Sequence, residues 1–116
     1  MHFKLIIIMT EDERTQKILD AARKAGTTGC TVLNQARGEG IKPAKTFLGL
    51  SIDSQVDVIL MLAEEHMSRE IMEQVAIAGE FDETPGTGIA FQIDVEDAIG
   101  VRHQIQVLTG AVEDRL

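Results

Sequence analysis

The sequence predicts an α+β fold in which an antiparallel four-stranded sheet carries two helices on one face. The order of the expected elements supports this prediction. A strand–helix–strand pattern occurs twice, over about residues 4–35 and 55–94, and each copy joins a nearly all-apolar strand to a helix with acidic residues near its start. The core must also be aliphatic, because 44% of the 116 residues are hydrophobic and only 3% are aromatic.

The first half begins with the apolar run Leu5–Met9, which is typical of a strand that is covered on both faces. Thr10 and Glu13 then form a capping-box signature, which predicts a helix start, and apolar residues recur at helical spacing after it. Gly26 can adopt the left-handed conformation that ends a helix, so we expect the helix to stop there. A second strand is expected over about Gly29–Ala36.

The second half repeats this order. An apolar strand is expected over Gln55–Ala63, and Ser68 is the expected cap of a helix that ends at Gly79. The glycine-rich turn Glu83–Gly88 leads to a fourth strand over Ile89–Val95. This order of elements is that of the ferredoxin-like βαββαβ plan.

Two segments lie outside the repeat. Residues 37–54 are predicted to form a long loop, which is uncommon inside a small domain and is usually functional. The tail, residues 96–116, contains one further strand candidate, His103–Leu108. At this length we expect residues 1–116 to form a single domain.

The predicted strands are too apolar for a sheet with one face in water. We therefore expect the face without helices to be buried by oligomerisation, and a closed trimer is the ring that we predict.

Composition excludes several classes of partner. A net charge of −8 argues against binding nucleic acid through its phosphates. The sequence has neither a signal-peptide pattern nor a run of about 18 apolar residues that would insert into a membrane. The lone Cys30 excludes an internal disulfide and fits a reducing compartment. We expect a cytoplasmic protein.

Small residues gather in two places that could face a ligand. Gly29 lets a neighbour or ligand come close to the backbone, and Thr27, Thr28 and Thr31 supply hydroxyls beside it. In the second place, two glycines flank Thr87. The same residues also serve ordinary turns, so both interpretations remain open. The chain's histidines share no metal-ligand spacing, and no candidate nucleophile has a base nearby in sequence. We predict no metal site and no catalytic residues.

Four segments resemble the PII family of nitrogen-regulatory signalling proteins. They are Ala25-Gly-Thr-Thr-Gly-Cys-Thr-Val32, Arg37-Gly-Glu-Gly40 at the start of the long loop, Gly86-Thr-Gly88 before Phe91–Val95, and Thr109-Gly-Ala-Val-Glu-Asp114. The resemblance implies a non-enzymatic ferredoxin-like homotrimer that binds an adenine nucleotide (ADP, AMP or ATP) in clefts between subunits. It further implies that the 37–54 loop contacts a transporter, an enzyme or a regulator. The residues it places at the nucleotide are Gly29, Cys30, Thr31, Arg37, Gly38, Gly40, Gly86, Thr87 and Gly88.

The sequence also departs from the family pattern. Ile89 stands where the family carries a lysine, and Gln106 and Leu108 stand near the positions of its basic pair. The chain has no tyrosine, so it cannot be uridylylated as some members are. Two other functions remain open: a metal-binding tolerance protein similar to the CutA family, and a trimeric interaction module without a small ligand.

Overall fold

The structure is a computed structural model that describes residues 1–36, 46–47, 50–51 and 55–115. Its elements are β1 (Phe3–Glu11), a 3-10 helix (Asp12–Arg14), α1 (Thr15–Ala25), β2 (Thr31–Ala36), β3 (Thr46–Phe47), β4 (Leu50–Ser51), β5 (Val56–Glu64), α2 (Glu65–Gly79), β6 (Gly88–Val95) and α3 (Arg102–Arg115).

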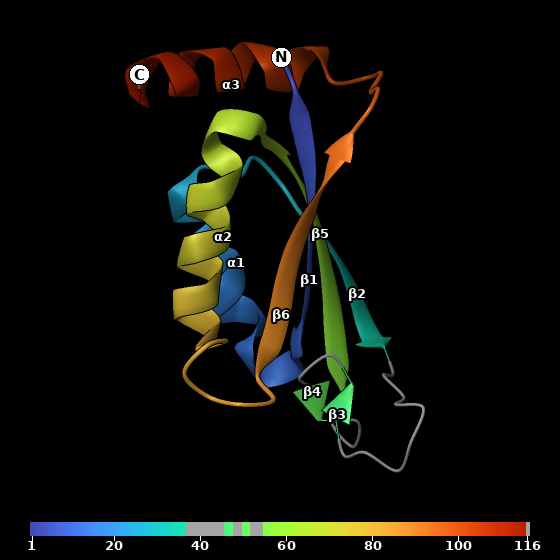
Figure 1. The fold of residues 1–116 in the computed structure, drawn as a ribbon. Coiled ribbons are helices and arrows are strands. Elements are labelled where there is room, and N and C mark those ends of the chain that lie inside the picture. The colour runs from blue at the N-terminus through green and yellow to red at the C-terminus, as the bar shows by residue number, and fades with distance from the viewer. Residues whose placement is uncertain (37–45, 48–49, 52–54, 116) are drawn as a thin grey trace.

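The four long strands form one antiparallel sheet in the order β2-β5-β1-β6. α1 and α2 lie together on one side of this sheet, and α3 crosses its end near the N-terminus (Figure 1). The predicted ferredoxin-like plan is therefore confirmed. The short strands β3 and β4 pair with each other within the predicted long loop, and the rest of that loop lies outside the described residues.

The core lies between the helices and the sheet because alternate residues of β1 and β5 point toward α1 and α2. Ile6, Ile8 and Ile59 are fully buried there. They pack with helix residues at positions three or four apart, which are Ile18, Ala22 and Ala25 on α1 and Met67, Ile71 and Val75 on α2.

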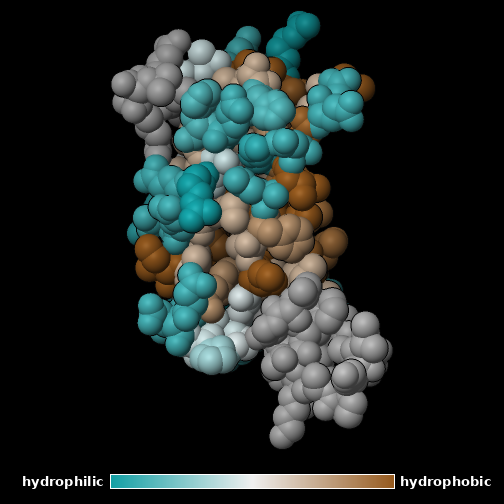
Figure 2. Space-filling view, in the orientation of Figure 1, coloured by the Kyte–Doolittle hydropathy of each residue, from teal (hydrophilic) through white to brown (hydrophobic). Residues whose placement is uncertain are grey.

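The opposite sheet face is apolar, and neither α1 nor α2 covers it (Figure 1). The register sets three rows of side chains across the three strands β6, β1 and β5: Ile93–Leu5–Leu62, Phe91–Ile7–Leu60 and Ile89–Met9–Val58. None of these side chains is fully buried, and Leu33 of β2, beside Val58, is 50% exposed. Figure 2 shows hydrophobic residues gathered on the side of the strands that lies away from the helices.

Both predicted helix starts are wrong. Thr10 belongs to β1, and its buried hydroxyl donates to the carbonyl of Thr87 instead of capping a helix. α1 begins at Thr15, after the 3-10 helix, and no side chain caps it. α2 begins at Glu65, where the Glu64 carboxylate accepts the backbone N–H of His66, so the cap lies before Ser68.

The strand predicted over His103–Leu108 is also wrong, because these residues belong to α3. Val101 and Ile105 stand four residues apart and both pack against the core, and the Ile105 N–H donates to the Val101 carbonyl. No helix among the described residues is long and apolar enough to cross a membrane.

Candidate functional site

The first predicted ligand segment, Gly29–Thr31, lies on the surface where α1 gives way to β2. Gly26 ends α1 with a φ of 119°, as predicted, and Thr27 donates its hydroxyl to the Gly29 carbonyl at 3.2 Å. Gly29, Cys30 and Thr31 are all exposed, and a Cβ added at Gly29 would meet no atom of the described residues within 4 Å. The segment therefore offers open surface at one edge of the sheet.

The second predicted segment, Gly86–Gly88, is held from inside the molecule. Thr87 is 1% exposed, and its hydroxyl lies 3.0 Å from the Glu80 carbonyl and 2.9 Å from the Thr84 carbonyl. The Thr10 hydroxyl in turn donates to the Thr87 carbonyl at 2.9 Å. The side chain of Thr87 therefore points into the protein, and only the backbone of the turn is available to a ligand.

Gly88 is required by packing whether or not a ligand binds. A Cβ at Gly88 would lie 2.3 Å from Cε1 of Phe81 and 2.8 Å from the carbonyl oxygen of Met9. The same Phe81 ring would lie 2.3 Å from a Cβ at Gly79. Sequence reasoning missed Phe81, because a single aromatic residue in a loop has no periodicity to mark it. The glycines that it contacts were the only signal.

The two predicted segments do not meet within one chain. Gly29–Thr31 leads into β2 and Gly86–Gly88 leads into β6, which are opposite edges of the sheet with β5 and β1 between them. Arg37, Gly38 and Gly40 follow β2 directly and lie outside the described residues. A site built from both segments therefore needs a second copy of the chain.

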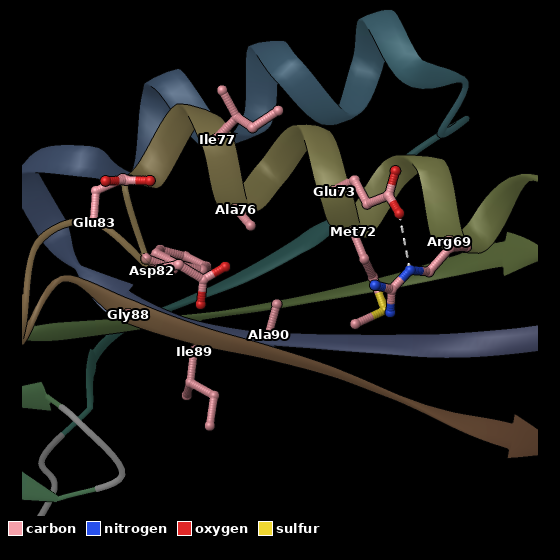
Figure 3. A pocket seen from close by; sticks show the side chains of 11 residues that line it. Arg69, Met72, Glu73, Ala76, Ile77, Asp82, Glu83, Gly88, Ile89 and Ala90 are labelled. Carbon is pink, nitrogen blue, oxygen red and sulfur yellow. Dashed lines mark hydrogen bonds and ion pairs between the residues drawn. The ribbon is translucent and has the colours of Figure 1, made fainter.

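A hollow of about 480 Å³ lies between α2 and β6, next to the Gly86–Gly88 turn (Figure 3). Small or apolar residues such as Met72, Ala76 and Ala90 line it, together with the charged residues Arg69, Glu73, Asp82 and Glu83. Arg69 is paired with Glu73 at 3.0 Å, and Asp82 points into the hollow. With acids in excess, this side of the turn does not suit a phosphate.

The basic side chain near the end of α2 is already paired. Arg14 donates to the Glu80 carboxylate at 2.6 Å and to the Gly79 carbonyl at 3.3 Å. The hydrogen bond from Arg14 lowers the pKa of Glu80, and the charge of Arg14 adds to this effect. Ile89 points away from α2 toward the open sheet face (Figure 3).

Glu64, Glu65 and His66 place possible metal ligands within 4.8 Å of one another at the start of α2. Glu64 is 2% exposed, and its carboxylate accepts a hydrogen bond from the backbone N–H of His66 at 2.8 Å. The same carboxylate is hydrogen-bonded to Nδ1 of the His66 ring at 2.6 Å. This hydrogen bond raises the pKa of His66 above 6.5. A helix cap therefore accounts for the arrangement.

Comparison with known families identifies the family of this chain. The family of the nitrogen regulatory protein P-II matches residues 3–104. The chain belongs to the P-II family. The match spans both halves and the start of α3, so the family resemblance in the sequence is confirmed.

Solved structures of PII-like proteins share the fold. CPII from Thiomonas intermedia K12 bound to ADP, AMP and acetate has a TM-score of 0.66 at 19% identity, over 87% of this chain and 93% of that one. The apo form of CPII has a TM-score of 0.63 at 19% identity, over 82% and 90% of the two chains. A PII-like signalling protein of Thermus thermophilus has a TM-score of 0.59 at 20% identity, over 81% and 87%. No curated protein matches the chain.

Proposed function

We propose that this P-II family chain is a cytoplasmic regulatory protein, not an enzyme, that binds an adenine nucleotide between the subunits of a homotrimer. The nucleotide would control residues 37–54, through which the trimer acts on a partner protein. CPII, which shares the fold, binds ADP and AMP. Whether the signal concerns nitrogen depends on the partner.

The apolar sheet face supports the trimer. Three cross-strand rows of aliphatic and aromatic side chains are partly exposed in one chain. Burying such a surface is favourable by roughly 25 cal/mol per Å² of apolar area. A closed ring covers the same face on every copy and leaves no edge for further addition.

The positions of the two predicted segments carry the nucleotide proposal. Gly29–Thr31 and Gly86–Gly88 lie at opposite edges of the sheet, so a ring of copies can bring the first segment of one chain to the second segment of its neighbour. Arg37, Gly38 and Gly40 continue from β2 and would extend the same wall. Cys30 would lie in this cleft as a small contact residue.

Charge sets the expected phosphate preference. Asp82 and Glu83 are exposed beside the turn, and Ile89 and Gln106 occupy positions where the family carries cations. A third phosphate therefore gains little, and we expect AMP and ADP to bind about as well as ATP, with micromolar or weaker dissociation constants (about −8 kcal/mol or less favourable).

Light scattering and calorimetry test the proposal together. The expected mass is three times the 12.7 kDa of one chain. Replacing Ile7, in the middle of the apolar face, by Asp should yield monomers that no longer bind nucleotide. An Ile77→Asp substitution on α2 is the matched control, since it makes the same change at a side chain that is 69% exposed and lies away from the apolar sheet face. A monomeric wild type would contradict the proposed trimer. A hundredfold preference for ATP over AMP (about 2.7 kcal/mol) would contradict the expected phosphate preference.

A further inference from the structure

We propose that Thr87 is a positioning residue of the nucleotide site, which fixes the Gly86–Gly88 turn without touching the ligand itself. This inference rests on the proposed function, because it concerns the same turn. It changes the role of Thr87 from a contact residue to an internal anchor.

The anchor joins three parts of the chain. The Thr87 hydroxyl shares its single proton between the carbonyls of Glu80, just after α2, and Thr84, within the turn. The Thr87 carbonyl accepts the Thr10 hydroxyl at 2.9 Å and the Glu11 N–H at 3.3 Å, both from β1. One buried residue therefore ties the turn to the end of α2 and to a central strand.

The neighbours of Thr87 explain why an anchor is needed. Gly86 has a φ of 81°, a conformation that glycine adopts freely but in which it is not locked. Gly88 is the residue where β6 begins. A turn with glycine on both sides of one residue would sample many shapes if that residue were not held in place.

A fixed turn favours binding because an anion is held by backbone N–H groups that point in one direction. Groups that are already ordered lose little freedom when the ligand arrives, whereas a mobile turn must be ordered at the expense of affinity. The Thr87 side chain contributes this order from the interior, at 1% exposure. No cation is needed for this contribution.

The test compares hydroxyl removal at two buried sites. Thr87→Val keeps the shape of the side chain and removes the hydroxyl, and Thr87→Ser keeps the hydroxyl. Ser68→Ala is the matched control, because Ser68 is also 1% exposed and also donates to a backbone carbonyl, that of Glu65, at the opposite end of α2. AMP and ADP affinities are measured by calorimetry well below each melting temperature.

We expect Thr87→Val to weaken the binding of AMP and of ADP at least tenfold, and Thr87→Ser to keep both affinities within about threefold of wild type. Ser68→Ala should lose stability but keep its affinity for both nucleotides. If Thr87→Val does not fold, Thr10→Val removes the bond to the Thr87 carbonyl and should weaken binding in the same direction. Unchanged affinity in the folded Thr87 or Thr10 variant overturns the inference and leaves the proposed function standing. A wild-type trimer that binds neither nucleotide overturns both.

Discussion

The two strand–helix–strand halves return to the sheet in different ways. After α1, the hydrogen bonds of Gly26 and Thr27 within the described part of the chain reach Ala22, Arg23 and Gly29, so they are local. After α2, Thr87 is bonded to β1, far away in sequence, as well as to Glu80. The first turn is therefore positioned by its own helix and strand, and the second by tertiary contacts.

This difference shows that one order of elements can produce two kinds of turn. The exposed surface around Gly29 tolerates changes in shape, whereas the turn around Gly88 is enclosed by Phe81 and Met9. A substitution in the second turn should therefore affect folding and binding together, and one in the first turn should separate them.

The largest expected effect is at Gly88. Gly88→Ala would bring a Cβ within 2.3 Å of the Phe81 ring and 2.8 Å of the Met9 carbonyl, which is backbone and cannot swing aside. We expect overpacking to lower the free energy of unfolding by about 2–3 kcal/mol. At about 4 °C per kcal/mol, the melting temperature should fall clearly. Calorimetry at fixed protein concentration measures it. The combination with Phe81→Leu should be milder than the sum of the two single effects, and an unchanged melting temperature would show that the enclosure is loose.

A smaller effect is expected at Gly26. Its φ of 119° lies in the region that disfavours a side chain. Gly26→Ala should cost about 1 kcal/mol in chemical denaturation, with no change in the core. Gly110→Ala, within α3 with nothing within 4 Å of the added Cβ, is the control and should be neutral or slightly stabilising. An equal effect at both positions would mean that the positive φ of Gly26 is not the cause of the cost of Gly26→Ala.

Most of the fold could be predicted from sequence because its signals are local. The apolar runs marked β1 and β5, and Gly26 and Gly79 marked the ends of the helices. The errors arose where a distant partner decided the outcome. Thr10 looks like a helix cap until Thr87, 77 residues away, accepts its hydroxyl.

The tail strand was wrong for a related reason, and the sequence could not show how the Gly86–Gly88 turn is held. Ile105 and Val107 alternate as in a strand, yet the spacing that packs is that of Val101 and Ile105. The motif around Gly86–Gly88 was found, but the inward direction of Thr87 and the role of Phe81 depend on tertiary contacts. Sequence pattern alone reveals neither the direction of the Thr87 side chain nor the role of Phe81.

The helix starts also differ between the halves, and this predicts a pH effect at the start of α2. No side chain caps α1, whereas Glu64 caps α2 and raises the pKa of His66 above 6.5 through their hydrogen bond. A raised pKa in the folded state stabilises the protein below 6.5, and that contribution is lost as the pH rises through the raised value. As the pH rises above 6.5, the melting temperature of wild type should thus fall more than that of His66→Ala. Parallel curves for the two proteins would contradict this.

The smallest expected effect on stability is at Gly29, the position where the two turns differ most. A Cβ at this position meets no atom within 4 Å among the residues that the structure describes, and the φ of Gly29 is not in the positive region. Gly29→Ala should therefore change the free energy of unfolding by no more than about 0.5 kcal/mol. Gly29→Phe should be equally harmless to the isolated fold, because the space around it is open. If the cleft between subunits lies here, the phenylalanine fills it and abolishes AMP binding while the trimer mass is kept. Full AMP affinity in a folded, trimeric Gly29→Phe protein would place the nucleotide elsewhere. Loss of both AMP binding and the trimer would instead place Gly29 in the contact between subunits.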